Sequence, residues 1–429
     1  MSRFGDLPDA VRPGRVSAAA AAPGRVGPWG RVEAFFRRRG GGLLYWVVVC
    51  ALFWISWKRV VETTKIASPD SIHYYGQALV FSGVSRPEAF RQSTALFDGW
   101  GWPGLVKSVE ELLDWDLVRP RVAFPLLASP LVGAWDWAGM VALALALGAA
   151  FYAVTAAALL RRHGLVPALG AVLAVFGCQA WFFFAVTPLT EGLSALLLAL
   201  ALGCAWAYRR AAPSRAGAAG GGGPDRPGRF GSRLPRWLWL LGAGLLMLVF
   251  AFSRQAQLVP AGALLAAWAG EWIRSGRPRN SWSAPAAVIV GVSAATQVYQ
   301  LIVYPLAELD QFRLRQSGET TWEALLALPR RFLGVTAFDI KYSLGKDPGL
   351  VFAMVLLVAA VIVAWRRVEV QMALGAALAG LVYHAVNGSD HLEFRYLEPG
   401  FFVYALAVGA LLAHLAAQHP SPGAIRAAA

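Results

Sequence analysis

The stretch from Leu189 to Tyr208, LTEGLSALLLALALGCAWAY, carries one charged side chain, Glu191, near its start and is followed directly by Arg209 and Arg210. A membrane-spanning helix needs about 20 predominantly apolar residues, and basic residues gather beside such spans on the cytoplasmic side. The stretch therefore predicts a transmembrane helix. Its Arg end should face the cytoplasm and its Glu end the opposite side.

The same apolar pattern recurs along the chain. Of the 429 residues 57% are hydrophobic and 15% are charged, whereas charged residues make up roughly 25% of an ordinary soluble domain. We predict an all-α polytopic membrane protein with about ten transmembrane helices. They are expected at residues 43–57, 138–160, 165–185, 189–208, 237–253, 256–273, 284–305, 349–365, 371–386 and 400–417, with a further short apolar piece at 122–134.

The charge balance is strongly basic and indicates how the chain is oriented. The net charge is +14 and is carried mostly by Arg. In a soluble chain this balance would indicate nucleic-acid binding. Here the Arg residues fall in short loops between apolar spans, so we predict membrane lipids as partners and no nucleic acid. With a cytoplasmic N-terminus every short basic loop lies on one side of the plasma membrane, and the abundance of Ala, Arg and Gly favours a bacterial source.

Three segments of different composition define the predicted domains. Residues 1–40 are rich in Arg, Gly, Pro and Ala and predict a disordered basic cytoplasmic tail. Residues 41–418 form the transmembrane domain, and residues 419–429 form a second cytoplasmic tail. Cys50, Cys178 and Cys204 lie within apolar segments and are interpreted as small hydrophobic side chains.

Three long connections interrupt the transmembrane domain. Residues 209–236 form a Gly-rich cytoplasmic linker, and residues 58–137 and 306–348 form two extracytoplasmic loops. In these outer loops, residues 103–115 and 321–335 place apolar side chains at helical spacing with charges between them. This pattern predicts helices that lie in the membrane interface.

Ionisable and aromatic residues near the ends of the spans collect on the extracytoplasmic side. Charged groups at the hydrocarbon boundary are energetically expensive, so they usually serve a function or pair with one another. They come from several separate connections, and we expect them to converge in one site. The candidates are Asp70, His73, Tyr74, Arg121, Glu191, Arg254, His391, Arg395 and Tyr396.

Each of these residues also has a simpler interpretation. Asp70 follows Ser-Pro and is a good cap for the helix that begins SIHYYGQAL. His73 and Arg395 could anchor the chain at the interface. Arg254 could neutralise an acid between helices or reach the headgroups, and Glu191 could serve as an acid in the first turn of its helix.

Five short motifs, in this order along the chain, resemble a known family. They read D-S-I-H-Y-Y-G-Q-A-L after the first span, then R-P-R-V-A-F-P-L-L, P-L-T-E-G-L-S-A-L-L-L-A-L-A-L and S-R-Q-A-Q-L-V-P, and F-R-Y-L-E-P-G-F before the last span. Together they resemble the GT-C superfamily of membrane glycosyltransferases, which use polyprenyl-phosphate-linked sugars. The motifs cover parts of residues 43–417 and do not distinguish mannosyltransferase-like from aminoarabinose-transferase-like members. Many members carry a second acid beside the first, whereas Ser71 follows Asp70 here.

The resemblance implies a GT-C-like fold and transfer of a hexose or pentose from a polyprenyl-phosphate donor. The acceptor hydroxyl, on a glycan, a lipid or a protein, would lie on the extracytoplasmic face and would lose its proton to Asp70 as general base. Guanidinium groups would stabilise the leaving phosphate, first Arg254 and Arg395 and then Arg121. Sugar or acceptor contacts are expected from His73, Tyr74, Glu191, His391 and Tyr396, with Tyr75, Trp100 and Trp102 as further stacking candidates.

No metal site is predicted, because Ser71 replaces the second acid. A divalent cation (Mg²⁺, Mn²⁺ or Ca²⁺) bound near His73, Glu191 and His391 is the one cofactor left open. Two functions of other classes also remain as alternatives. A transporter or flippase of a lipid-linked sugar or an anion would need charges near the membrane midplane, and a non-catalytic GT-C-like assembly subunit would keep the scaffold without the chemistry.

Overall fold

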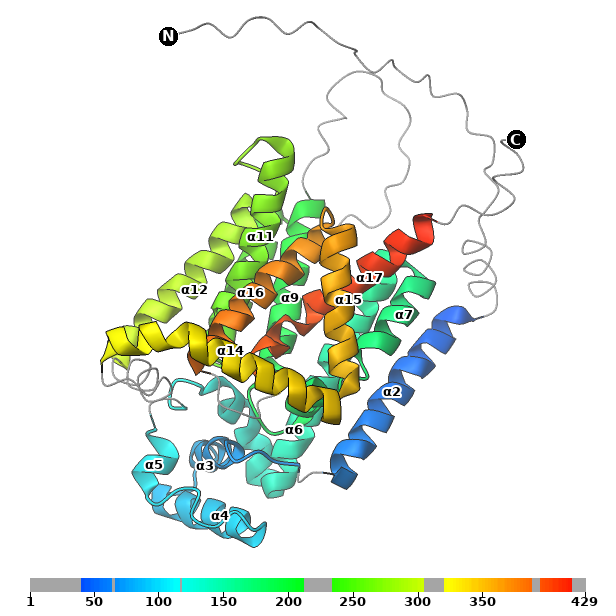
Figure 1. The fold of residues 1–429 in the computed structure, drawn as a ribbon. Helices are drawn as coiled ribbons and strands as arrows, with labels where there is room; N and C mark the ends of the chain where they lie inside the picture. Colours follow the sequence, from blue (N-terminus) through cyan, green and yellow to red (C-terminus); the bar gives the residue numbers. More distant parts are fainter. Residues whose placement is uncertain are drawn as a thin grey trace, which may run out of the picture.

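In the computed structural model, the described residues form a bundle of α-helices with one 3-10 helix and no strand (Figure 1). The prediction of an all-α fold is thereby confirmed. The structure describes residues 40–63, 66–115, 118–211, 234–304, 320–387 and 394–418. The predicted tails, most of the cytoplasmic linker, the start of the second outer loop and His391 lie outside these ranges.

Within these described ranges, six helical segments are long and apolar enough to cross a membrane, or seven if one bent pair counts as a span. The bent pair consists of α7 (Leu165–Val175) and α8 (Gln179–Val186), which meet at 86°. The number and length of these apolar helices are consistent with a helical membrane protein. The count of ten spans stays a prediction. The six segments are α2 (Gly41–Thr63), α6 (Ala123–His163), α9 (Glu191–Arg210), α12 (Ser283–Val303), α16 (Val368–Asn387) and η2 (Arg395–Gly400) continued by α17 (Phe401–Gln418).

Three further helices occupy the remaining predicted spans. They are apolar, but α10 has 16 residues and α15 has 17, fewer than the roughly 20 that a straight span requires. The third, α11, carries Glu271 and Arg274 in its last two turns. Their bounds are Arg236–Ala251 for α10, Leu258–Ser275 for α11 and Pro348–Ala364 for α15.

The short apolar piece predicted at 122–134 and the span predicted at 138–160 are the two arms of α6, and the break between them lies at Asp136, as the sequence indicated. The helix changes direction at Asp136, whose φ of 55° is not helical. The hydroxyl of Tyr75 donates a hydrogen bond to the Asp136 carboxylate at this kink. Gly139 is required there, because a Cβ atom at this position would lie 2.1 Å from the carbonyl oxygen of Leu131.

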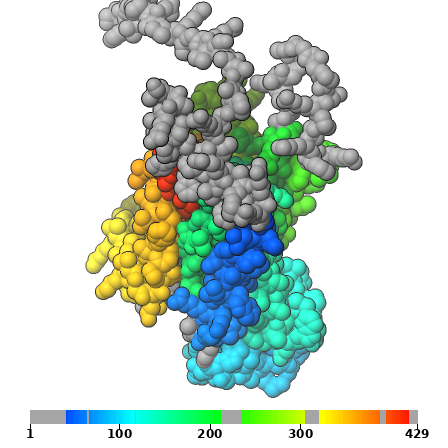
Figure 2. Space-filling model, turned by 90° about the vertical axis from the view of Figure 1, so that its right-hand side faces the viewer, coloured from blue at the N-terminus to red at the C-terminus, as the bar shows by residue number. Residues whose placement is uncertain are grey.

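The first outer loop folds into a compact cap at one end of the bundle (Figure 1). Its helices α3 (Ser71–Phe81), α4 (Arg86–Gly99) and α5 (Val109–Leu113) enclose a small core around Phe97 and Leu112. Figure 2 shows the cap in cyan and light blue beyond the end of α2. Trp100 packs edge-on against the ring of Trp137, so it belongs to the core of the cap.

The interfacial helix predicted for residues 103–115 was wrong in length, because α5 has only five residues. Gly104 has a φ of 68°, which keeps residues 103–108 out of a helix. The helix begins only where the Ser108 hydroxyl accepts a hydrogen bond from the Glu111 amide.

The helix predicted for residues 321–335 is present and longer than expected. It is α14 (Thr321–Lys346), which begins with reciprocal hydrogen bonds between Thr320 and Glu323 and runs across the end of the bundle near the cap (Figure 1). Leu326 and Leu333 on this helix are about two-thirds exposed, at 65% and 67%. An exposed apolar face of this kind suits a helix in contact with lipid.

Helices α11 and α16 approach each other more closely than side chains would allow. A Cβ atom at Gly375 would lie 2.2 Å from the carbonyl oxygen of Gly262, and one at Gly262 would lie 2.5 Å from that of Gly375. Small residues permit this close packing of helix backbones. The contact matters for the site, because α11 begins shortly after Arg254 and α16 ends shortly before Arg395.

Candidate functional site

Asp70 immediately precedes α3, yet its side chain does not cap the helix. Its carboxylate accepts no hydrogen bond from the first turn. The local turn is closed instead by Ser71, whose hydroxyl accepts a hydrogen bond from the Ser68 amide at 3.0 Å. Capping therefore does not explain Asp70, and its carboxylate is free to face residues from distant parts of the chain.

Arg395 joins Asp70 to Glu191. Its Nη1 atom lies 3.0 Å from Oδ2 of Asp70, and its Nε atom donates to Oε1 of Glu191 at 2.5 Å. Glu191 is the first residue of α9, and Arg395 is the first residue of η2. Three elements widely separated in sequence thus meet through one guanidinium group.

Arg254 extends this group from the turn between α10 and α11. Its Nη1 atom lies 3.3 Å from Oε1 of Glu191 and 3.5 Å from Oε2 of Glu398. Its Nη2 atom donates to the carbonyl oxygen of Arg395 at 3.3 Å. Asp70, Glu191, Arg254, Arg395 and Glu398 are called the acid–arginine cluster below.

The acids of the cluster differ in how far their side chains are exposed to the surroundings. The side chains of Glu191 and Glu398 are 1% exposed, whereas that of Asp70 is 38% exposed. Arg254 and Arg395 are almost buried, at 6% and 12%. The Asp70 carboxylate is therefore partly open to the surroundings, while Glu191 and Glu398 are covered by protein.

Arg121 lies beside the cluster and makes a different set of contacts. Its Nη1 atom donates to the hydroxyl of Tyr74 at 3.0 Å, and its Nη2 atom to Oε1 of Gln255 at 3.3 Å. Both partners are neutral, so the charge of Arg121 is not cancelled by a direct contact among the described residues. Tyr74 itself is fully buried and packs edge-on against Phe124.

The charges around Asp70 determine its ionisation. Burial raises the pKa of its carboxyl group, but the neighbouring guanidinium of Arg395 and the charge of Arg121 lower it by more, and the net pKa lies below the usual value for Asp. Asp70 is therefore ionised at neutral pH. A carboxylate in this form can accept a proton from a hydroxyl group that approaches its exposed side.

Asp339 holds the backbone that presents Arg395. The Phe394 amide donates to Oδ2 of Asp339 at 3.2 Å, and Phe394 adopts a φ of 56°, which non-glycine residues rarely do. Nε2 of His384 lies 3.4 Å from the same carboxylate oxygen, and both side chains are fully buried. Residues from α14 and α16 thus fix the turn into η2.

The sequence did not single out Asp339 or Glu398 as parts of the site. Glu398 was present in the quoted motif F-R-Y-L-E-P-G-F, where an acid three residues after Arg395 in an apolar context was a usable signal. Asp339 gave no such signal, because it lies within an amphipathic helix where an Asp is unremarkable.

Two of the sequence candidates make other contacts. Nδ1 of His73 donates to the carbonyl oxygen of Leu112 at 3.0 Å, and the ring lies 4.9 Å from that of Trp115. His73 thus ties α3 to α5 within the cap. The ring of Tyr396 lies 5.9 Å from the guanidinium carbon of Arg254, at the edge of the cluster.

The described residues do not form a metal site. Within the ranges given above, no group of three or more His, Cys, Asp or Glu side chains could hold an ion. Glu191 and Glu398 face guanidinium groups, and His73 faces a carbonyl oxygen. The described donors around Asp70 therefore do not form a divalent-cation site, and His391, the third predicted ligand, lies outside the described residues.

A comparison with protein-family models found no match for the chain, and neither did comparisons with curated proteins and with solved structures.

Proposed function

We propose that the chain is an integral membrane glycosyltransferase that moves a sugar from a polyprenyl-phosphate donor to an acceptor hydroxyl. The observation that carries the proposal is the position of Asp70, a partly exposed carboxylate held by Arg395 and near Arg121, which contacts no acid directly among the described residues. The order of sequence motifs that resembles the GT-C superfamily supports it. The site would lie on the extracytoplasmic face, at the end of the bundle that carries the cap.

In this proposal Asp70 acts as the general base. Arg395 binds its Oδ2 atom and orients the carboxylate, so that the other oxygen can accept the proton of the attacking hydroxyl. The new glycosidic bond forms as the bond between the sugar and the phosphate breaks. The polyprenyl phosphate leaves with the bonding electrons, and the proton passes to Asp70.

The geometry changes which arginine is assigned to the donor phosphate. Arg254 and Arg395 already face three carboxyl groups within the cluster, so little of their charge is left to attract an anion. Within the described part of the chain, the side-chain hydrogen bonds of Arg121 go to the neutral groups of Tyr74 and Gln255. We therefore assign the leaving phosphate first to Arg121, with Arg254 and Arg395 as groups that organise the acids.

One observation favours a second candidate, a non-catalytic membrane subunit. Neutralisation of Arg254 and Arg395 by buried acids is also what a purely structural ion-pair network would show. The transporter alternative is less well supported. The cluster is built from the starts of α9 and η2 and the turn between α10 and α11, all at helix ends, whereas a transport site is expected near the midplane.

The test is to reconstitute the full-length protein in liposomes with radiolabelled polyprenyl-phosphate sugars and a lipid extract as acceptor. The proposal expects label to leave the polyprenyl carrier and to appear on a second molecule in covalent linkage. Label that crosses the bilayer while still attached to its carrier would indicate a flippase. Label that stays on its carrier and on its side would favour the subunit without catalytic activity.

A further inference from the structure

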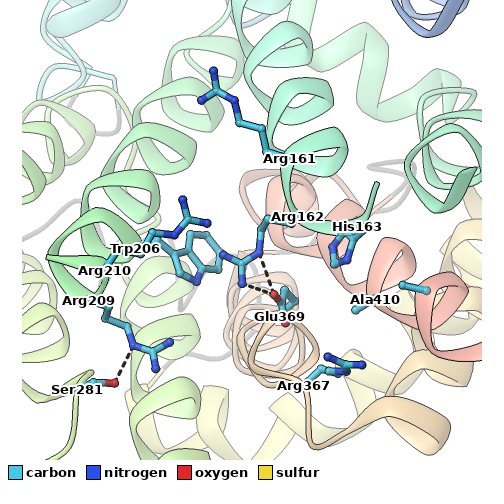
Figure 3. Close-up of a pocket in the computed structure, with 11 residues that line it drawn as sticks. Arg161, Arg162, His163, Trp206, Arg209, Arg210, Ser281, Arg367, Glu369 and Ala410 are labelled. Atoms are coloured by element: carbon cyan, nitrogen blue, oxygen red, sulfur yellow. Dashed lines mark hydrogen bonds and ion pairs between the residues drawn. The ribbon is translucent and has the colours of Figure 1, made fainter. Parts of the chain in front are cut away.

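A second concentration of charge lies at the other end of α9 from Glu191. Because α9 has 20 residues and each adds about 1.5 Å, this end is about 30 Å from the acid–arginine cluster. There the structure forms an open cavity of about 700 Å³ (Figure 3). Its charged lining consists of Arg161, Arg162, Arg209, Arg210, Arg367 and Glu369. These residues, with Trp206, are called the arginine cavity below.

Two of the five arginines are neutralised and held in place. Nε of Arg162 donates to Oε1 of Glu369 at 2.9 Å, and its guanidinium lies 4.5 Å from the ring centre of Trp206. Arg209 pairs with Glu271 at 3.6 Å and stacks over Trp282. These contacts hold the guanidinium groups of Arg162 and Arg209 in place and pair each of them with an acid, Glu369 or Glu271.

Arg161, Arg210 and Arg367 have no acidic partner among the residues that the structure describes, and all three are exposed. Three positive charges therefore border one cavity with no acid paired to them in the described part of the chain. Arg161 and Arg210 lie in the last turns of α6 and α9, where a cation is favourable to the helix dipole. Arg367 immediately precedes α16, where a cation is unfavourable. The helix dipoles therefore do not account for the whole set.

A second pocket of about 430 Å³ adjoins the arginine cavity and shares Arg367 with it; Arg366 and His414 line it as well, beside a larger apolar part. Its walls include Ile362, Val363 and Trp365 at the end of α15. Ile362 is 73% exposed and Trp365 is 47% exposed. A cationic cavity that continues into an apolar one matches a ligand with an anionic head and a hydrocarbon tail.

We infer that the arginine cavity binds the phosphate headgroup of an anionic phospholipid, with an acyl chain against Ile362, Val363 and Trp365. Arg210 and Arg367 would donate charge-assisted hydrogen bonds to the phosphate oxygens. Basic pockets between helices on the cytoplasmic side of a membrane are well suited to such headgroups. The inference concerns the opposite end of the molecule from Asp70 and holds whether or not the chain transfers sugars.

The experiment measures lipid binding to the delipidated full-length protein in detergent. Phosphatidylglycerol is compared with phosphatidylcholine of the same acyl chains and with inorganic phosphate, by affinity and by the rise in Tm. The double variant Arg210→Gln/Arg367→Gln removes two charges that make no contact with an acid. The matched control, Arg277→Gln/Arg279→Gln, removes two exposed charges that do not line the cavity.

We expect phosphatidylglycerol to bind the parent and the control more tightly than phosphatidylcholine does. The double variant should lose at least about tenfold in affinity for phosphatidylglycerol. A second variant, Ala413→Trp, fills the cavity without changing its charge and should weaken binding in the same way. This variant also keeps the inference testable if the double variant fails to fold.

Two results would overturn the inference. Equal losses in the double variant and the control would show attraction to general surface charge instead of a site. If inorganic phosphate stabilises the protein as much as phosphatidylglycerol does at the same free concentration, the cavity binds a soluble anion and not a lipid.

Discussion

Glu191 and Asp70 bind the same guanidinium group but differ in what their removal should do. Glu191 is covered and contacts both Arg395 and Arg254, whereas Asp70 is partly open to the surroundings and, among the described residues, forms an ion pair with Arg395. Buried ion pairs are sensitive to the loss of one partner, because the other charge is then left uncompensated in a medium of low dielectric constant. Exposed pairs contribute little to stability.

Glu191→Gln is therefore expected to destabilise the protein by about 3–5 kcal/mol, because two almost buried guanidinium groups lose their shared carboxylate. Asp70→Asn should cost at most about 1 kcal/mol. Thermal or denaturant unfolding in detergent measures both. Equal stability of the two variants would mean that Glu191 does not hold the cluster together.

Arg121→Gln tests the assignment of the leaving phosphate. Loss of a charge-assisted contact made in the transition state should lower kcat/KM for the donor by about 10- to 100-fold, and Arg121→Lys should recover part of it. The control is Arg86→Gln, which breaks the exposed pair with Asp114 in the cap and should leave transfer unchanged. If the Arg121→Gln variant transfers sugar at the parent rate, Arg121 does not bind the leaving phosphate, and Arg254 and Arg395 become the candidates for that contact.

At the level of single elements, the apolar runs of the sequence predicted where helices form. The details that escaped prediction depend on contacts between distant residues. The kink in α6 requires Asp136 to face Tyr75 and Gly139 to lie against Leu131, and neither pairing is visible in the local pattern. Asp339 is likewise recognisable only after α14 is seen to reach the Phe394 amide.

The close contact of α11 with α16 gives a prediction for these elements. Gly375→Ala places a methyl group against the backbone of Gly262 and should destabilise the protein by about 1–3 kcal/mol. Transfer should also fall, since the two helices position Arg254 and Arg395. The matched control is Gly291→Ala in α12, where a Cβ atom meets open space. If both variants unfold at the same temperature, the close approach does not contribute to stability.

Across the whole molecule, the charge pattern predicted the separation that the structure shows. Charged groups at the starts of α9 and η2 form the acid–arginine cluster, and basic residues at the ends of α6 and α9 border the arginine cavity. The sequence predicted from topology alone that the residues of the acid–arginine cluster lie on one side of the membrane, because alternate loops lie on opposite sides. It did not reveal that the basic residues border an open cavity, since this depends on how the helix ends pack.

The orientation of the molecule can be tested by chemical labelling of intact cells. Asp98→Cys places an exposed thiol in the cap, and Arg277→Cys places one near the end of α11. A membrane-impermeant maleimide should label the first variant in intact cells and the second only after permeabilisation. The reverse pattern would place the acid–arginine cluster in the cytoplasm, where the proposed donor is not presented.

The central claim is that the carboxylate of Asp70 performs proton transfer at an extracytoplasmic site. Its most direct test is the rate of sugar transfer by Asp70→Asn relative to Asp98→Asn. The control makes the same change of charge in the cap, where the Oδ1 atom of residue 98 can still accept the hydrogen bond from the Gly104 amide. We predict a loss of about 10²- to 10⁴-fold for Asp70→Asn with unchanged folding, and no loss for the control. Transfer by a correctly inserted Asp70→Asn protein at the rate of the parent would contradict the account.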